Sequence, residues 1–137
     1  MLTIYSIRMN QLVVSALVLL SSTLYVQAQE DLIKGLKTGF KTGNVKEISP
    51  YLGQRTEIAF DSEKTSYDKE KTEQTLSKFL VDAKPKDFQM LHQGASKEGI
   101  KFYIGELTSD LGTYRILIYL KKNESRNLIE SIDISKE

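Results

Sequence analysis

The sequence predicts an α+β protein in which N-terminal helices pack on a curved, mostly antiparallel sheet. The first observation is the helical spacing of apolar residues in two segments, residues 30–42 and 69–83. The second is a series of later segments in which apolar residues recur at every other position, which is the period of a strand. Helices that precede a run of consecutive strands are typical of the α+β class.

The first 28 residues have the pattern of a secretory signal peptide. Arg8 places a positive charge near the start, residues 12–20 form an apolar core, and the small residue Ala28 precedes Gln29. The apolar core is shorter than the roughly 20 residues that span a bilayer. We therefore expect cleavage near Ala28, which would leave residues 29–137 as a single domain, without a membrane anchor, in the periplasm or outside the cell.

Composition excludes several classes of function for residues 29–137. The whole chain has 19 basic and 18 acidic residues, and Arg8 is the only charged residue in the predicted signal peptide, so the remainder is neutral. This balance gives no support for a nucleic-acid partner. The chain has no cysteine, which excludes a thiol nucleophile and a thiolate metal site. We expect neither a metal nor a cofactor.

Two helices and a strand are expected before residue 61. In the segment 30–42, two glycines four residues apart, Gly35 and Gly39, would let another element approach closely. Asn44 can cap a second, short helix, whose length is limited by Pro50. Residues 56–60 alternate like a strand, and residues 61–64 read as a polar turn.

The main helix is expected over residues 69–83, with Asp68 as its N-cap. Its buried stripe is predicted from the apolar residues at helical spacing, which are Leu76, Phe79, Leu80 and Ala83. Four strands are then predicted, over residues 88–93, 100–108, 113–122 and 127–135. Residues 109–112 suit a tight hairpin that ends in glycine, and residues 123–126 form a second hairpin.

The predicted strand 113–122 is apolar on both faces, which is unusual for a sheet with one face in water. The face of Ile116 and Ile118 should meet the helices. The other face, with Arg115, Leu117 and Tyr119, should be at least partly enclosed, as in a curled sheet with a pocket at its mouth. The alternative is that side chains simply fill this second face.

Several short motifs resemble a known family of small exported bacterial proteins. They are Gly-Phe-Lys-Thr-Gly-Asn at residues 39–44, His-Gln-Gly at 92–94, Tyr-Ile-Gly-Glu-Leu at 103–107 and Tyr-Arg at 114–115. Together with the order of elements, they resemble the domain of unknown function 4783 and the nuclear transport factor 2-like cone. The resemblance implies that cone fold; it implies no activity, cofactor or substrate.

Four residues are the candidates for a ligand site. Arg115 can bind a carboxylate ligand in a two-pronged manner, although an arginine in such a position more often pairs with a neighbour, here Glu106 on the adjacent strand. His92 is the only histidine and can act as an acid or a base, or it is an ordinary strand residue. Tyr119 shares the face of Arg115.

These observations lead to two functional hypotheses. The first is an exported, non-enzymatic binding or interaction module that takes a small anionic ligand or a protein partner, with a dimer as one possible state. The alternative is a small enzyme of the isomerase or hydratase type, which would need an acid–base residue in its pocket. The sequence contains neither a phosphate-binding glycine loop nor a nucleophile elbow that would favour another enzyme class.

Overall fold

The computed structural model describes residues 2–124 and 126–137, without the side chains of residues 2–9, 20–22 and 25. The positive charge of Arg8, on which the signal-peptide interpretation draws, lies outside the described residues, as does part of the hairpin 123–126. The chain divides into two compact units, Met1–Ile33 and Lys34–Glu137. The predicted cleavage site after Ala28 falls within the first unit.

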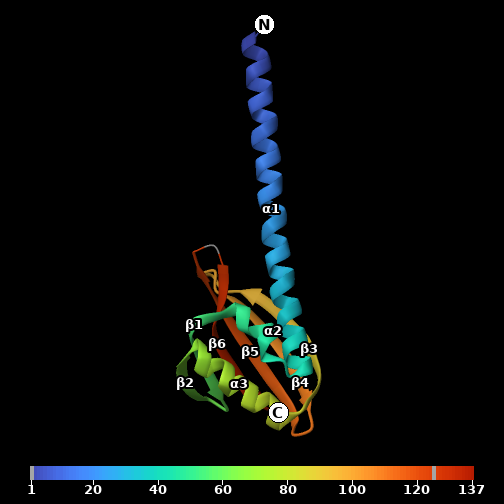
Figure 1. Ribbon diagram of the computed structural model, residues 1–137, viewed down its shortest axis with the longest axis vertical. Coiled ribbons are helices and arrows are strands. Elements are labelled where there is room, and N and C mark those ends of the chain that lie inside the picture. The colour runs from blue at the N-terminus through green and yellow to red at the C-terminus, as the bar shows by residue number, and fades with distance from the viewer. Residues whose placement is uncertain (1, 125) are drawn as a thin grey trace. The chain divides into compact units, whose positions relative to one another are not determined.

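Helix α1 extends from Leu2 to Thr42, so it begins far earlier than the sequence pattern predicted (Figure 1). The apolar core of the predicted signal peptide is helical, and its described side chains are exposed; Leu12, for example, retains 72% of its accessible surface. Among the described residues, no helix combines the length and the apolar character that crossing a membrane requires. The helix ends where predicted, before Gly43, whose φ is +71°.

The two glycines of α1 permit the close approach that the sequence suggested. A methyl group on Gly35 would lie 2.6 Å from Cε2 of Tyr51, and one on Gly39 would lie 2.5 Å from Cγ1 of Ile48. These partners belong to helix α2 (Val45–Ile48) and to the 3-10 helix η1 (Ser49–Tyr51). The side chain of Asn44 accepts a hydrogen bond from the backbone amide of Lys46, as expected of an N-cap.

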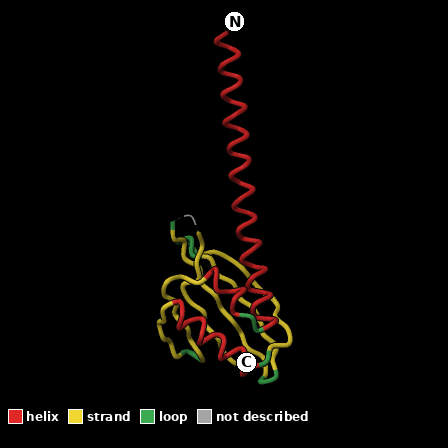
Figure 2. Tube along the Cα trace, viewed as in Figure 1, coloured by secondary structure: helices red, strands yellow, loops and turns green. Residues whose placement is uncertain are grey.

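The sheet has six strands in the order β2-β1-β6-β5-β4-β3. Their bounds are β1 Leu52–Phe60, β2 Glu63–Asp68, β3 Pro85–Ala95, β4 Lys101–Ser109, β5 Gly112–Asn123 and β6 Arg126–Lys136. Only the β1–β6 pair is parallel, and the other four pairs are antiparallel. Short turns connect several of the strands (Figure 2). The α+β class and the mostly antiparallel sheet are therefore confirmed.

One strand was missed by the sequence reading. Residues 63 and 64, assigned there to a polar turn, begin β2, which pairs with β1 along its whole length. The strand consists almost entirely of exposed residues and forms one edge of the sheet. The turn itself contains only Asp61 and Ser62, both with positive φ.

Helix α3 spans Lys69–Ala83 as predicted, and the Asp68 side chain accepts a hydrogen bond from a first-turn backbone amide over 2.8 Å. Leu76, Leu80 and Ala83 are buried, whereas Phe79 is only partly buried. Lys84 ends the helix in the left-handed conformation, directly before the proline that begins β3. The side-chain cap of Asp68 and the left-handed Lys84 therefore define the two ends of α3.

The helices pack against one face of the sheet. On that face, Phe79 of α3 meets the edge of Tyr114 of β5, with ring centroids 5.1 Å apart, and Phe40 of α1 stacks on Phe88 of β3. Ile116 and Ile118 of β5 are almost fully buried on the same face, as predicted. The core therefore lies between this face and the helices.

An ion pair lies at the margin of this core. The ammonium group of Lys41, at the end of α1, lies 3.4 Å from the carboxylate of Asp87 in β3. Hydrogen bonds from the Gln89 side chain, from the backbone amide of Phe88 and from Lys41 hold the pKa of Asp87 below its ordinary value of 3.8. Asp87 therefore favours the charged state in the folded protein.

Candidate functional site

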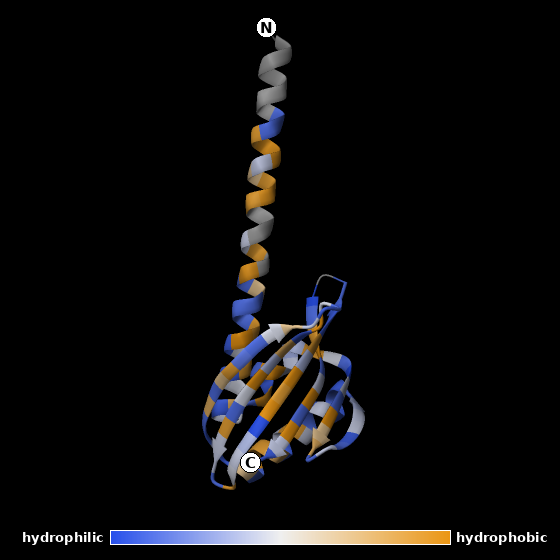
Figure 3. Cartoon of the chain, turned by 180° about the vertical axis from the view of Figure 1, so that it is seen from behind, coloured by the Kyte–Doolittle hydropathy of each residue, from blue (hydrophilic) through white to orange (hydrophobic). Residues whose placement is uncertain are grey.

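The other face of the sheet is not covered by α2 or α3, and we call it the open face (Figure 3). Residues of adjacent strands lie opposite one another on it in rows. One row joins His92, Ile104, Leu117 and Asp133 from β3 to β6. The expectation of an at least partly enclosed second face holds only in part: Phe102, Ile104 and Leu117 are partly buried, but the side chain of Arg115 retains 61% of its accessible surface and Tyr119 retains 36%.

Four side chains form a continuous apolar patch on the open face. The patch consists of Phe102 and Ile104 of β4 and their cross-strand partners Tyr119 and Leu117 of β5. Their rings and aliphatic groups are adjacent; the Phe102 and Tyr119 centroids are 6.5 Å apart. All four retain partial exposure, so this face is only partly removed from water.

The four predicted site residues all lie on strands β3 to β5; one of them belongs to the apolar patch and another lies beside it. His92 is exposed, and its ring centroid lies 5.8 Å from that of Phe102. Tyr119 is itself part of the patch. Glu106 lies opposite Arg115 in the register, as predicted. The ion pair differs from the prediction, because the guanidinium of Arg115 lies 2.7 Å from Glu137 instead of pairing with Glu106.

A charged group borders the patch on the side of β6, β1 and β2. The Lys64 ammonium group lies 3.1 Å from the Glu57 carboxylate. The hydrogen bond to Glu57 and then the negative charge of Asp133 raise the pKa of Lys64 above its ordinary value of 10.5. One carboxylate oxygen of Asp133 is buried and accepts no hydrogen bond from the described residues. The two acidic residues therefore share one nearby cation.

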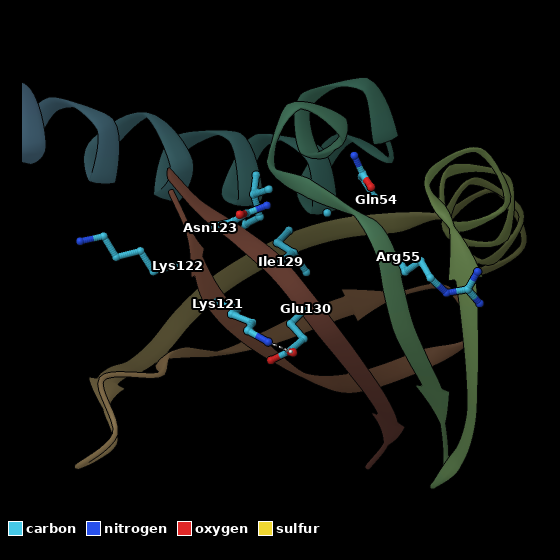
Figure 4. A pocket seen from close by; sticks show the side chains of 9 residues that line it. Gln54, Arg55, Lys121, Lys122, Asn123, Ile129 and Glu130 are labelled. Atoms are coloured by element: carbon cyan, nitrogen blue, oxygen red, sulfur yellow. Dashed lines mark ion pairs between the residues drawn. The ribbon is translucent and has the colours of Figure 1, made fainter. Parts of the chain in front are cut away.

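A pocket of about 310 Å³ lies elsewhere, at the end of the sheet where β1 separates from β6 (Figure 4). Its lining residues are Gly53, Gln54 and Arg55 of β1, Lys121, Lys122 and Asn123 of β5, and Leu128, Ile129 and Glu130 of β6. None of the four predicted site residues lines it. Figure 4 shows the side chains of Lys121 and Glu130 meeting at the pocket, and their charged atoms lie 3.6 Å apart.

The sequence reading missed this pocket because it arises from the register between strands. Two interruptions in strand pairing occur at the same place, and the local sequence gives little indication of either. A pair of lysines followed by an asparagine at the end of a strand reads simply as the approach to a turn. The one local signal is Gly53 at the start of β1, since an interior strand glycine often marks a bulge.

The described side chains do not group as metal ligands. No cluster of three or more histidine, aspartate and glutamate residues within the described part of the chain has the arrangement needed to hold an ion. Neither the open face nor the pocket thus presents a recognisable metal centre.

Comparison with known proteins identifies both the family and the fold. The model of a family described as a domain of unknown function, DUF4783, matches residues 33–135. A crystal structure of a DUF4783 family protein from Bacteroides ovatus is 33% identical, with a TM-score of 0.71, and the match covers 75% of this chain and 93% of that one. A second, from Bacteroides fragilis, is 31% identical with the same TM-score and covers 75% and 96% of the two chains.

More distant structures share the fold alone. An NTF-2 like protein of unknown function from Shewanella oneidensis is 12% identical, with a TM-score of 0.60, over 81% of this chain and 98% of that one. The nuclear transport factor 2-like fold expected from the sequence is therefore confirmed. Among curated proteins, none matches the chain significantly.

Proposed function

Because the chain belongs to the DUF4783 family, whose description names no activity, we propose from its geometry that it is an exported, non-catalytic module that self-associates through the open face. The observation that carries this proposal is the apolar patch of Phe102, Ile104, Leu117 and Tyr119. Partly exposed, continuous apolar surface on a soluble domain is typical of protein–protein contacts, and aromatic residues are enriched there.

The charges around the patch favour a second copy of the chain as the partner. Each of three bordering cations has an acidic partner within the chain: Arg115 with Glu137, Lys64 with Glu57, and Lys121 with Glu130. A face on which charges of both signs are paired within the chain does not strongly repel a copy of itself, whereas a strongly charged partner would gain little from it. In a two-fold dimer the patch would meet its own equivalent.

Self-association is tested by the molecular mass of the protein in solution as a function of its concentration. We expect a monomer–dimer equilibrium that Tyr119→Glu weakens by more than about tenfold, because a charge would be buried in the interface. The matched control is Val81→Glu, which introduces the same charge at an exposed valine of α3. Circular dichroism establishes that both variants fold.

The dimer proposal is wrong if the native protein remains a monomer at every accessible concentration. It is also wrong if Tyr119→Glu and Val81→Glu associate equally well. In the second case the association would occur through a different surface.

Export is the other part of the proposal. It is supported by the order of charge, apolar core and small residue up to Ala28, and by the exposure of the described apolar side chains of residues 12–19. Mass spectrometry of the protein recovered from a bacterial host is expected to show a chain that begins at Gln29. Recovery of chains that retain residues 12–20 would contradict export by cleavage.

No observation on the described residues favours the alternative of an isomerase or hydratase. The acid–base candidates His92 and Glu106 lie on β3 and β4 of the open face and do not line the pocket. General acid–base chemistry needs such a group within hydrogen-bonding reach of an enclosed substrate. We therefore retain the binding module as the proposed function.

A further inference from the structure

The pocket at the end of the sheet is built by two irregularities that meet at one residue. Between β1 and β6, Leu52 pairs with Ile129 and Glu57 pairs with Ser131, so Glu130 alone faces residues 53–56 of β1. Between β5 and β6, the register also shifts, and Glu130 has no opposite residue there either. Toward β5, Glu130 is therefore the extra residue, whereas toward β1 the extra residues belong to β1, whose residues 53–56 stand against Glu130 alone. Bulges of this kind occur preferentially beside binding sites, where they redirect side chains.

The same irregularity separates β1 from its neighbours. The registers with β6 and with β2 give Gly53 and Gln54 no opposite residue in either strand. A side chain at position 53 would have its Cβ 3.2 Å from the carbonyl oxygens of Arg55 and Ile129, so glycine fits this position best. The separation opens the volume of about 310 Å³, which is near the lower end for small-molecule sites.

The lining of the pocket has an excess of positive charge and of hydrogen-bond donors. Three cations, Arg55, Lys121 and Lys122, face one acid, Glu130, and that acid is already paired with Lys121. Residues 29–137 as a whole contain equal numbers of both signs, so this local excess is not a consequence of composition. The amide side chains of Gln54 and Asn123 add further donors.

The two unpaired cations lie at the rim, where they can turn toward a ligand. Figure 4 shows the side chains of Arg55 and Lys122 extending outward from the pocket. Both are exposed, and Arg55 is held by one long hydrogen bond of 3.4 Å to the Ser66 carbonyl oxygen. Both side chains are therefore available to contact an anion.

We propose that this pocket binds a small organic anion through a carboxylate or phosphate group, which the cations Lys122 and Arg55 and the amide donors of Gln54 and Asn123 contact. Arginine and lysine are the residues that proteins use for such oxyanions. None of the four patch residues lines the site, although the Lys121–Glu130 ion pair that borders the patch also lines the pocket.

Backbone amide shifts of the ¹⁵N-labelled protein, titrated at low ionic strength, test the proposal. The probes are inorganic phosphate and succinate, with uncharged succinamide as the matched neutral control. We expect saturable shifts at Gly53, Gln54 and Glu130 with at least one anion, and none with succinamide. Whichever anion binds more tightly identifies the oxyanion group that the site prefers.

Four variants define the contribution of the lining. Lys122→Gln and Arg55→Gln should each weaken binding about two- to fivefold, as expected for exposed charge contacts. Glu130→Gln should strengthen it by a similar factor, because it removes the only acid and releases Lys121. The control Arg115→Gln removes an exposed cation outside the pocket and should leave binding unchanged.

Two results would overturn the proposal. One is the absence of saturable shifts at the pocket with both anions. The other is an equal loss of binding in Arg115→Gln and Lys122→Gln, which would show diffuse attraction by surface charge. A Glu130→Gln variant that binds less tightly would likewise exclude the assigned role of the extra residue.

Discussion

Replacement of Gly39 by alanine should destabilise the protein, although the same change stabilises an ordinary helix. Gly39 lies within α1, and an added Cβ would lie 2.5 Å from Cγ1 and 2.9 Å from Cδ1 of Ile48, and 3.1 Å from the carbonyl oxygen of Asn44. Ile48 is fully buried, so its side chain has no solvent into which it can turn. The backbone oxygen limits movement on the remaining side.

The magnitude follows from two opposing effects. In a free helix, replacement of glycine by alanine gains about 1 kcal/mol. Overpacking a close-packed contact costs about 1–3 kcal/mol. Because Cγ1 is bonded directly to the buried Cβ of Ile48, we expect the upper part of that range, and hence a net loss of about 1–2 kcal/mol in the free energy of unfolding.

Urea unfolding measures this loss, with the midpoint and slope compared between variants. A double-mutant cycle supplies the control. In an Ile48→Ala background the two obstructing side-chain atoms are absent and only the Asn44 carbonyl oxygen remains near, so Gly39→Ala should become neutral or stabilising, by up to about 1 kcal/mol. If Gly39→Ala stabilises the native background as well, the close approach of α1 and α2 does not limit this position and our reasoning is refuted.

Three further predictions concern stability. Phe79→Ala should lower the free energy of unfolding in urea by about 2–3 kcal/mol, which is less than the usual cost for a fully buried phenylalanine. Phe79 is partly exposed and, among the aromatic residues of the described chain, contacts only the rings of Phe60 and Tyr114. A loss below about 1 kcal/mol would contradict this packing. Asp68→Ala should cost about 1 kcal/mol through loss of the α3 N-cap, whereas Asp68→Asn should retain most of it. Because the folded state lowers the pKa of Asp87, the charged carboxylate contributes to stability at neutral pH, and this contribution is lost as the pH falls below 3.8. Acid should therefore lower the stability of the native protein by more than it lowers the stability of the Asp87→Asn variant. Parallel curves of stability against pH for the two proteins would contradict this.

The sequence was sufficient for the elements whose apolar residues face one core. Helix α3 and strand β5 have clear helical and alternating patterns, and the structure confirms both. Strand β2 was missed because it lies at the sheet edge and buries almost nothing, so its polar residues carry no periodic signal. The start of α1 was misplaced because the predicted signal peptide is also helical.

The candidate site was less predictable, and the reason is physical. Strand alternation correctly placed Arg115 and Tyr119 on the face away from Ile116, but it could not show that this face is open. The partner of Arg115 is Glu137, which follows β6 in the sequence. Only the three-dimensional arrangement brings the two residues together. The pocket depends on the irregular pairing of β6 with β1 and β5 around Glu130, and apart from Gly53 these irregularities leave no trace in local composition.

The continuity of α1 through residue 28 has a consequence for the exported protein. In the full chain, the exposed acids Glu30 and Asp31 lie in the interior of this helix, and its first turn contains no acidic residue. Cleavage after Ala28 would create a new helix start, at which both acids meet the positive end of the helix dipole, a favourable interaction of about 0.3–1 kcal/mol each. Removal of the leader would thus give the remaining helix an N-terminus already suited to stand alone.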